Sequence, residues 1–126
     1  TAVEILDCDN FLIAHSTSSY PANYNELNLK MINTLDQMYD CPVGYSGHEV
    51  GLSTTISTIP LGACFIERHI TLSRAMWGTD QSASIEPQGM VKLARDIRLV
   101  ESALGDGIKK VYDSEKPIIA KLRGKS

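Results

Sequence analysis

The chain has 126 residues, of which 43% are hydrophobic and 21% charged, a composition typical of a soluble protein with one small core. The net charge is −3 with scattered basic residues, and no apolar run reaches the roughly 18–20 residues of a membrane span, so neither nucleic-acid nor membrane binding is predicted. Three cysteines without a CxxC pair indicate reduced thiols in the cytoplasm rather than a disulfide framework. Because the first residue is Thr1 and not Met, we expect the chain to be cut from a longer one.

Strand-like and helix-like patterns alternate along the chain. Thr1–Leu6 is typical of the last turns of a helix. Strands are expected at Phe11–Ala14, Val43–Ser46 and Cys64–Ile70, and helices from Asn25 or Asn28 to Tyr39, at Gly51–Leu61 and at Glu86–Leu104. Pro60 predicts an irregular last turn in the second helix, and Gly62 is suited to end it. Thr71–Ser84 is expected to be a long loop, and Asp106–Ser126 a linker or exit segment.

This alternation predicts an α/β fold with parallel strands and right-handed crossovers. In such folds ligands bind at the carboxyl ends of the strands. Three polar clusters fall at those ends, namely Ser16–Tyr20, Ser46–His48 and Glu67–His69. The connections at the opposite ends carry no comparable cluster, and this asymmetry indicates that the chain carries a site.

His48 and His69 follow successive strands and can meet at the same rim of the sheet. Neutral imidazole is a common ligand for divalent metals, so the pair is a candidate metal site. Two ligands leave positions open for substrate and water, which suits catalysis. The alternative is two hydrogen-bonded histidines that never meet.

Glu67 and His69 are two residues apart on one strand and therefore share a face, whereas Arg68 points to the other face, toward the helices. Glu67 is a candidate base or partner of a metal-bound water. The alternative is a buried partner for a basic group elsewhere in the sheet.

Two further segments lie near the expected site. The hydroxyl-rich Ser16–Ser19, which contains Ser18, could bind phosphate together with Ser46, or be an ordinary turn. In the long loop, Asp80 could bind sugar hydroxyls while Trp77 shields the pocket, or the loop could simply cover the sheet end.

Several motifs, in order and with matching spacing, resemble the sialic acid synthase family, whose members condense phosphoenolpyruvate with amino sugars. They are HSTSSYP at 15–21, GYSGHEVG at 44–51, LGA at 61–63, IERHITL at 66–72, WGTDQSASIEP at 77–87, LVESALGDGIKK at 99–110 and SEKP at 114–117. The resemblance covers nearly the whole chain.

The resemblance implies a fold for the family and indicates which part of that fold this chain matches. The family has a TIM-type (β/α)8 barrel followed by an antifreeze-like domain, and this chain matches the last three strand–helix units, residues 1–105, with 106–126 leading toward the second domain. The full-length protein is expected to be a homodimer. Upstream strands carry the family's phosphate-binding lysines, so the isolated chain is expected to be inactive.

The resemblance also implies roles for individual residues. His48 and His69 match the ligands of a divalent metal, usually Mn²⁺, and Glu67 matches the glutamate beside it. Ser46 and Ser18 match phosphoenolpyruvate-binding positions, although a family member carries Asn at the latter. Tyr20 and Asp80 match positions that contact the amino sugar.

The sequence leaves alternatives open. The chain could be a non-catalytic part-barrel with inherited site residues, or part of another phosphoenolpyruvate aldol-type synthase with an aldose phosphate as acceptor. Within the leading interpretation, the acceptor could be N-acetylmannosamine, its 6-phosphate or a diacetamido sugar.

Overall fold

The computed structural model describes residue 3 and residues 11–124, and in it three parallel strands form one sheet. The strands are β1 (Ile13–Ser16), β2 (Val43–Gly47) and β3 (Ile66–Arg68), in the order β1-β2-β3. Ile13 pairs with Val43, and Ser46 pairs with Glu67. The predicted parallel pairing is therefore confirmed. The helical turn expected at Thr1–Leu6 lies outside the described residues, apart from Val3.

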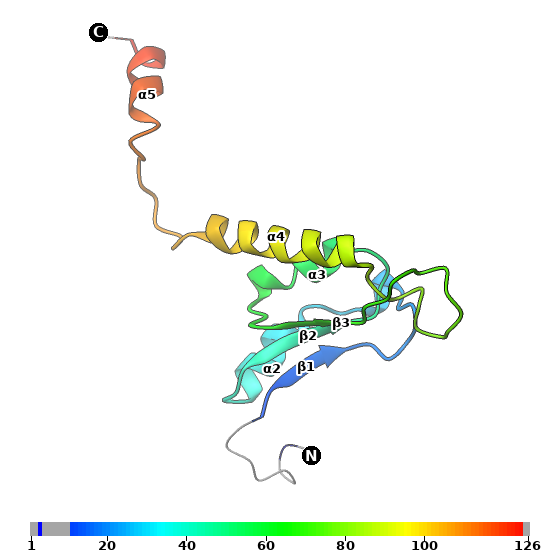
Figure 1. Cartoon of the computed structure of the whole chain (residues 1–126). Coiled ribbons are helices and arrows are strands. Elements are labelled where there is room, and N and C mark those ends of the chain that lie inside the picture. The colour runs from blue at the N-terminus through cyan, green and yellow to red at the C-terminus, as the bar shows by residue number, and fades with distance from the viewer. Residues whose placement is uncertain (1–2, 4–10, 125–126) are drawn as a thin grey trace.

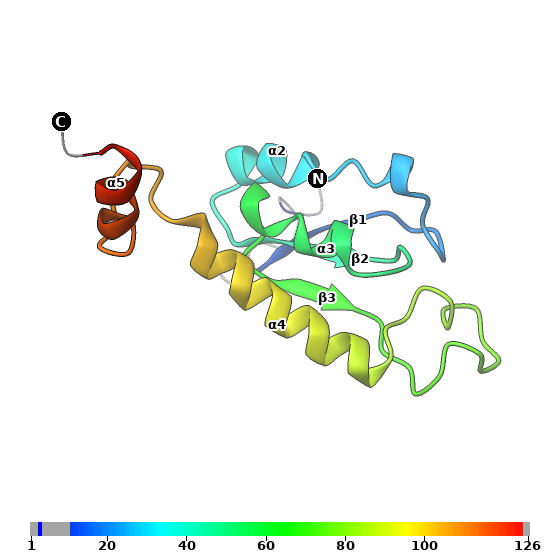
Figure 2. The ribbon, with the colours of Figure 1, turned by 90° about the horizontal axis from the view of Figure 1, so that it is seen from above.

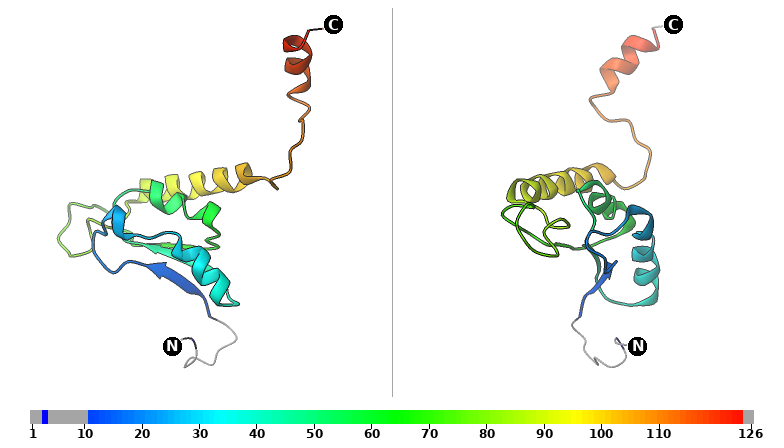
Figure 3. Two further views of the ribbon diagram at one scale, coloured as in Figure 1. Left: turned by 180° about the vertical axis from the view of Figure 1, so that it is seen from behind. Right: turned by 90° about the vertical axis from the view of Figure 1, so that its right-hand side faces the viewer.

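The helices that follow the strands lie on one face of this sheet (Figures 1 and 2). They are α2 (Met31–Met38), α3 (Ser53–Ile56) and α4 (Pro87–Leu104), with 3-10 turns η1 (Tyr24–Glu26) and η2 (Ile59–Leu61) beside them. Seen end-on, the three helices surround the outer side of the strands and leave the opposite side bare (Figure 3). We call that bare side the uncovered face.

The strand predictions were right in number and order but not in every boundary. β1 begins two residues later than the predicted Phe11 because it pairs with β2 from Val43 onward. The assigned β3 is shorter than the predicted Cys64–Ile70, yet the Cys64 amide donates to the Val43 carbonyl at 2.9 Å and Ile70 bridges to Ile85. The pairing therefore covers the predicted length.

The first helix begins at Met31, later than the predicted Asn25 or Asn28. Two further helix predictions need correction. The segment expected as one helix at Gly51–Leu61 is divided into α3 and η2, with the buried Thr58 hydroxyl donating to the Thr55 carbonyl at 2.6 Å between them. That local bond and the missing donor of Pro60 favour tighter turns over a continuous helix. Gly62 ends the segment at φ 96°, as its type predicts.

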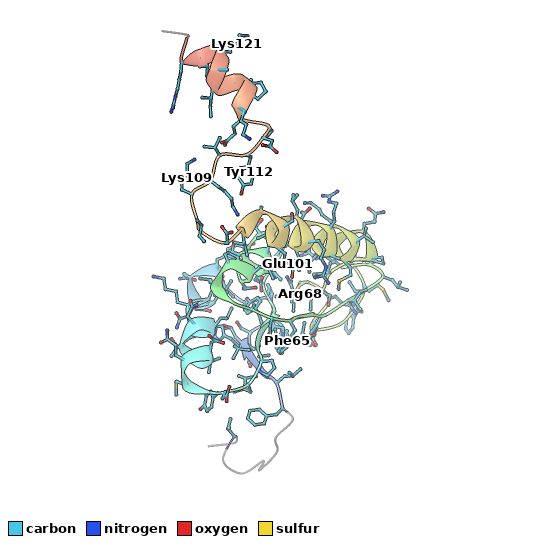
Figure 4. The ribbon with its side chains drawn as sticks, turned by 90° about the vertical axis from the view of Figure 1, so that its left-hand side faces the viewer. Phe65, Arg68, Glu101, Lys109, Tyr112 and Lys121 are labelled. Carbon is cyan, nitrogen blue, oxygen red and sulfur yellow. The ribbon has the colours of Figure 1, made fainter. Side chains whose placement is uncertain are left out.

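The second correction concerns the C-terminal segment. It contains a short helix, α5 (Lys116–Leu122), where only a linker was expected. Pro117 lies in its first turn, where proline fits without losing a hydrogen bond. α5 stands apart from the sheet at the end of an extended segment, along which Lys109 and Tyr112 lie (Figure 4).

The core lies between the sheet and the helices. Ile32 of α2 packs with Val43 and Tyr45 of β2 and with Ala63, all of them buried. Burial alternates along β1 and β3, so that Ile13 and Arg68 face the helices while Ala14 and Glu67 are exposed on the uncovered face. One face of each strand is therefore structural, and the other is free for chemistry.

On the uncovered face, the Phe65 ring lies over Gly44, where a Cβ atom would come within 2.5 Å of it. Gly44 and Phe65 stand two residues before Ser46 and Glu67, respectively, so they form an apolar layer directly below that polar pair. Within the described residues, no helix is both long and apolar enough to cross a membrane.

Both outer edges of the sheet are open to pairing. In the part of the chain that the structure describes, no named strand pairs with the outer edge of β1 or of β3. Unpaired edges recruit other strands. We therefore expect the isolated 126-residue chain to self-associate in sedimentation velocity, and Leu12→Lys, at an exposed residue just before β1, to weaken the association. A monodisperse monomer at all concentrations would contradict this expectation.

Candidate functional site

The carboxyl ends of the three strands bring two histidines together. His48 follows β2 directly and is 5% exposed, and His69 follows β3 directly with a side chain that is 30% exposed. Their ring centroids lie 5.0 Å apart in an edge-on arrangement. Two imidazoles this close can bind one ion, so the expectation that they meet is confirmed, and the alternative of two separate histidines is wrong.

Hydrogen bonding leaves the other ring nitrogen of His48 free. Its Nδ1 lies 2.8 Å from the Thr17 carbonyl and 3.4 Å from the Ser16 hydroxyl oxygen. A carbonyl only accepts, so Nδ1 carries the proton and Nε2 keeps the lone pair that a metal requires. Among the described residues, no group of three or more His, Cys, Asp or Glu side chains is arranged to hold a metal ion. The pair therefore fits an open site whose remaining positions are taken by water or substrate.

Tyr20 and Asp80 complete the surroundings of the histidines. The Tyr20 ring centroid lies 4.3 Å from that of His48 and 5.5 Å from that of His69. Asp80 Oδ2 lies 3.6 Å from His69 Nδ1, and its other carboxylate oxygen accepts from the Thr79 hydroxyl at 2.9 Å. The long loop thus contributes a carboxylate to the rim, as expected of Asp80.

Ser46 and Glu67 form a second group on the uncovered face. The Ser46 hydroxyl donates to Glu67 Oε2 at 2.5 Å. Glu67 is exposed, and among the described residues no basic side chain forms an ion pair with it. Each residue stands two positions before a histidine on its strand, and the pair therefore lies one layer below the imidazoles.

Two expected residues form no side-chain hydrogen bond with this cluster among the described residues. Ser18 is exposed in the loop after β1, and no side-chain hydrogen bond joins it to another described residue. Trp77 is fully exposed, with a relative accessibility of 101%. Among the described residues Trp77 covers no part of the histidine cluster, so the expectation that it shields the pocket is wrong.

On the opposite, helix-facing side, a buried ion pair joins the same two strand ends. Arg68 Nη1 lies 3.5 Å from Glu49 Oε1, with the two side chains 1% and 0% exposed. The guanidinium also donates to the carbonyls of Gly51, at 2.9 Å, and Ala83, at 3.2 Å. The pair therefore ties the segment after β2 to β3 and to the chain just before α4.

The Glu49 carboxylate is fully supplied with donors. Hydroxyls of Tyr45, Thr54 and Thr55 donate to it at 2.9, 2.8 and 2.7 Å. Burial alone would raise the pKa of Glu49, but the threonine hydrogen bonds and the Arg68 charge outweigh it, so the pKa lies below its usual value. The same burial, followed by the Glu49 charge, raises the pKa of Tyr45. Glu49 is thus an anion and Tyr45 a neutral donor.

Gly47 makes room for this pair. A Cβ atom at Gly47 would lie 2.7 Å from Glu49 Oε2, 2.7 Å from the Tyr45 ring and 2.9 Å from Arg68 Cδ. Only a residue without a side chain leaves the space that the carboxylate occupies. The glycine between Ser46 and His48 is therefore explained by packing.

Sequence reasoning placed Arg68 toward the helices, which is confirmed, but missed its partner Glu49. The signal was present, because Tyr45, Gly47 and Glu49 alternate on the same face as Arg68. A carboxylate on a buried face requires a cation, and Arg68 was the one predicted to point there.

With this geometry established, comparison with known proteins identifies the family. A sequence model of the NeuB family matches residues 1–109. The chain belongs to the NeuB family. Its sequence is 43% identical over 114 residues to N,N'-diacetyllegionaminic acid synthase of Campylobacter jejuni, covering 90% of this chain and 34% of that protein. It is 42% identical over 118 residues to human N-acetylneuraminate-9-phosphate synthase, covering 93% and 33%.

A solved structure supports the fold. The N-acetylneuraminic acid (sialic acid) synthetase of Leptospira borgpetersenii, crystallised with citrate, superposes with a TM-score of 0.75 at 34% identity, covering 90% of this chain and 40% of that one. The chain thus spans about a third of the length of these curated NeuB relatives. The relatives are synthases of sialic and legionaminic acids, so an enzyme of the nonulosonate synthase type is the family-level function.

The buried pair generates a prediction about stability. Arg68→Met removes the cation and leaves Glu49 buried without it, which should lower the free energy of unfolding by about 3–5 kcal/mol. Adding Glu49→Leu removes the stranded charge and should recover part of that loss. The matched control is Arg98→Met, because Arg98 pairs with Glu101 at 2.7 Å on the exposed side of α4 with a side chain 79% exposed.

Urea denaturation gives the free energy of unfolding of the complete protein in four forms. They are the wild type, Arg68→Met, the double variant Arg68→Met/Glu49→Leu and the control Arg98→Met. The control should change the free energy of unfolding by less than about 0.5 kcal/mol, as is usual for an exposed pair. Equal losses in Arg68→Met and Arg98→Met would contradict the structural role of the buried pair.

Proposed function

We propose that this chain is the metal-binding part of a nonulosonate synthase, which condenses phosphoenolpyruvate with an N-acetylated amino sugar and releases phosphate. The observation that carries the proposal is the His48–His69 pair, 5.0 Å apart at the carboxyl ends of adjacent strands, in a chain of the NeuB family. The supporting observation is the carboxylate of Glu67 on the same face, two residues before His69.

We further propose that residues 1–105 are the last three strand–helix units of a (β/α)8 barrel, and that 106–126 lead toward an antifreeze-like domain. The bare sheet face and the open strand edges support this, because a closed barrel would cover both. The complete protein is proposed to be a cytoplasmic homodimer. This chain alone is proposed to be inactive, because the resemblance places the family's phosphate-binding lysines in barrel strands other than the three proposed for this chain.

The proposed ion is Mn²⁺, held through Nε2 of His48 and His69. When bound, it would supply Lewis-acid polarisation of the acceptor's aldehyde. Tyr20 and Asp80, which surround the imidazoles, are proposed to orient the amino sugar. Ser46 and Ser18 are the positions that the family resemblance assigns to phosphoenolpyruvate.

In the proposed reaction, the methylene carbon of phosphoenolpyruvate forms a bond to the aldehyde carbon, and the aldehyde oxygen takes up a proton. Water then adds to C2 of the former enol, and the C–O bond to phosphate breaks. Glu67 is proposed to accept the proton of that water, because its carboxylate is exposed on the face where the substrates would meet.

The identity of the amino-sugar acceptor is not decided by the sequence comparisons. Identity to the legionaminic acid synthase is 43% and to the human N-acetylneuraminate-9-phosphate synthase 42%, a difference too small to favour either substrate. Parallel assays with N-acetylmannosamine, its 6-phosphate and a diacetamido sugar would decide between them.

Replacing a histidine of the pair tests the proposed metal site. In the complete protein, His48→Ala or His69→Ala should lower Mn²⁺-dependent condensation by more than about a thousandfold and abolish Mn²⁺ binding by calorimetry, since each removes one of two imidazole ligands. The measurement of activity is phosphate release coupled to formation of the keto acid, with and without a chelator.

His15 provides the matched control. Of the chain's three histidines it is the one outside the proposed site, and its Nε2 lies 2.7 Å from the Leu27 carbonyl oxygen on the helix-facing side. His15→Gln should keep Mn²⁺ affinity and activity within a few-fold of wild type. Full activity of either site variant in the presence of the chelator would disprove the metal assignment.

A further inference from the structure

A long loop carries the Asp80 carboxylate to the histidine pair. The loop joins β3 to α4, and its two stems meet where Ile70 bridges to Ile85. Asp80 Oδ2 lies 3.6 Å from His69 Nδ1, which is longer than a hydrogen bond, and the Asp80 side chain is 48% exposed. Contact with the imidazole therefore does not hold the carboxylate in place, and the backbone of the loop has to do so.

Asp80 begins a tight turn in that loop, and two arginines hold the turn. The Asp80 carbonyl accepts the Ala83 N–H at 3.1 Å. Arg74 Nη2 donates to the Ser82 carbonyl at 2.7 Å, and Arg68 Nη2 donates to the Ala83 carbonyl at 3.2 Å. Hydrogen bonds from a charged donor are stronger than those between neutral groups. Two guanidinium groups therefore fix consecutive carbonyls of the turn that carries Asp80.

The two arginines differ in their other contacts. Arg68 belongs to the buried ion pair with Glu49, so its loss affects the whole fold. Arg74 is exposed, and among the described residues its side chain makes one hydrogen bond, the one to Ser82. Its backbone N–H donates at 3.0 Å to Oε1 of Glu86, the residue just before α4. Arg74 therefore links the turn to the start of α4 without taking part in the core.

This link restrains the part of the loop next to the carboxylate. Ser82 follows Asp80 by two residues, so the hydrogen bond from Arg74 closes the loop beside Asp80. Without that bond, residues 75–82 gain conformational freedom, and the carboxylate spends less time beside His69. The effect stays local, because the bridge between the loop stems does not involve Arg74.

We infer that Arg74 is a positioning residue for the acceptor sugar, which acts by holding the turn that presents Asp80. This inference rests on the proposed function, in which Asp80 orients the amino sugar. It assigns the contribution of Arg74 to binding of that sugar. Its removal therefore affects the KM for the acceptor and leaves the KM for phosphoenolpyruvate and the affinity for Mn²⁺ unchanged.

Steady-state kinetics of the complete protein test the inference, with each acceptor that the wild type uses. Arg74→Met removes the donors and should raise the KM for the acceptor about fivefold. The KM for phosphoenolpyruvate and the affinity for Mn²⁺ should stay within about twofold of wild type. Arg74→Lys restores a charged donor and should recover part of the loss. An unchanged KM for the acceptor in Arg74→Met, or an equal rise in the KM for phosphoenolpyruvate, would overturn the inference.

Arg95 provides the matched control. Its side chain is 70% exposed on α4 and pairs with Asp96 at 2.9 Å, away from the loop. Arg95→Met removes the same charge from the same kind of exposed position, and it should leave both KM values within about twofold of wild type. A rise in the acceptor KM as large as that of Arg74→Met would show an effect of net charge and would overturn the inference.

A double-mutant cycle distinguishes positioning from direct binding. In the Asp80→Ala background the carboxylate is absent, so Arg74→Met should raise the KM for the acceptor less than about twofold. An equal rise in both backgrounds would show that Arg74 acts independently of Asp80, and would overturn the inference. A rise confined to the 6-phosphate of N-acetylmannosamine would show that Arg74 binds the phosphate directly, and would overturn it as well.

Hydrogen exchange separates this inference from the proposed function. If the wild-type protein condenses phosphoenolpyruvate with none of the three acceptors, the proposed function is wrong, and the positioning of Asp80 is then tested on the loop itself. In Arg74→Met the amide of Ala83 should exchange about tenfold faster than in wild type, while those of Thr71 and Ile85 at the loop stems keep their rates. An unchanged rate at Ala83 would overturn the inference.

Discussion

The buried pair of Glu49 and Arg68 is the interaction on which the arrangement of the site depends. Glu49 follows His48 and Arg68 precedes His69, so each charge is covalently next to one imidazole. The 3.5 Å contact between the two side chains, both nearly fully buried, fixes the ends of β2 and β3 relative to each other from the helix-facing side. Breaking such a pair on one side is costly, because the other charge stays buried. The buried pair on the helix-facing side of the sheet therefore fixes the separation of the two histidine rings on the other side.

Strand geometry gives the two faces of the sheet different roles, because one packs against the helices and the other carries the site residues. Residues alternate along a strand, so Tyr45, Gly47 and Glu49 point to the helices while Ser46 and His48 point to the uncovered face. The helix-facing set is buried, and the Glu49 carboxylate in it accepts three hydroxyl hydrogen bonds, while the other set is left free to meet ligands. Gly47 shows how tightly the two are coupled, because a single methyl group there would displace the Glu49 carboxylate. The segment 45–49 therefore contains both the site residues and the buried residues that position them.

Much of this could be predicted from the sequence, and the failures have physical causes. The parallel order and the meeting of His48 with His69 followed from the alternation of apolar runs and from the polar clusters at strand ends. The segment predicted as one helix at Gly51–Leu61 is interrupted between α3 and η2. The interruption depends on the hydrogen bond from the Thr58 hydroxyl to the Thr55 carbonyl, which cannot be inferred from periodicity. Trp77 was misjudged because the environment of a single loop side chain is set by tertiary contacts, and this side chain is fully exposed. Glu49 was missed although its face was predictable, since its burial became evident only with Arg68 opposite it. The roles of Ser18, Tyr20 and Asp80 toward substrate stay predictions.

The most direct test of the account is anomalous diffraction from crystals of the complete protein grown with Mn²⁺. The account predicts one ion bound to Nε2 of both His48 and His69, with Nδ1 of His48 still on the Thr17 carbonyl and the Glu49–Arg68 pair intact behind the sheet. An ion bound elsewhere, or through Nδ1 of His48, would contradict it, because the hydrogen bond that fixes the imidazole would then have to break.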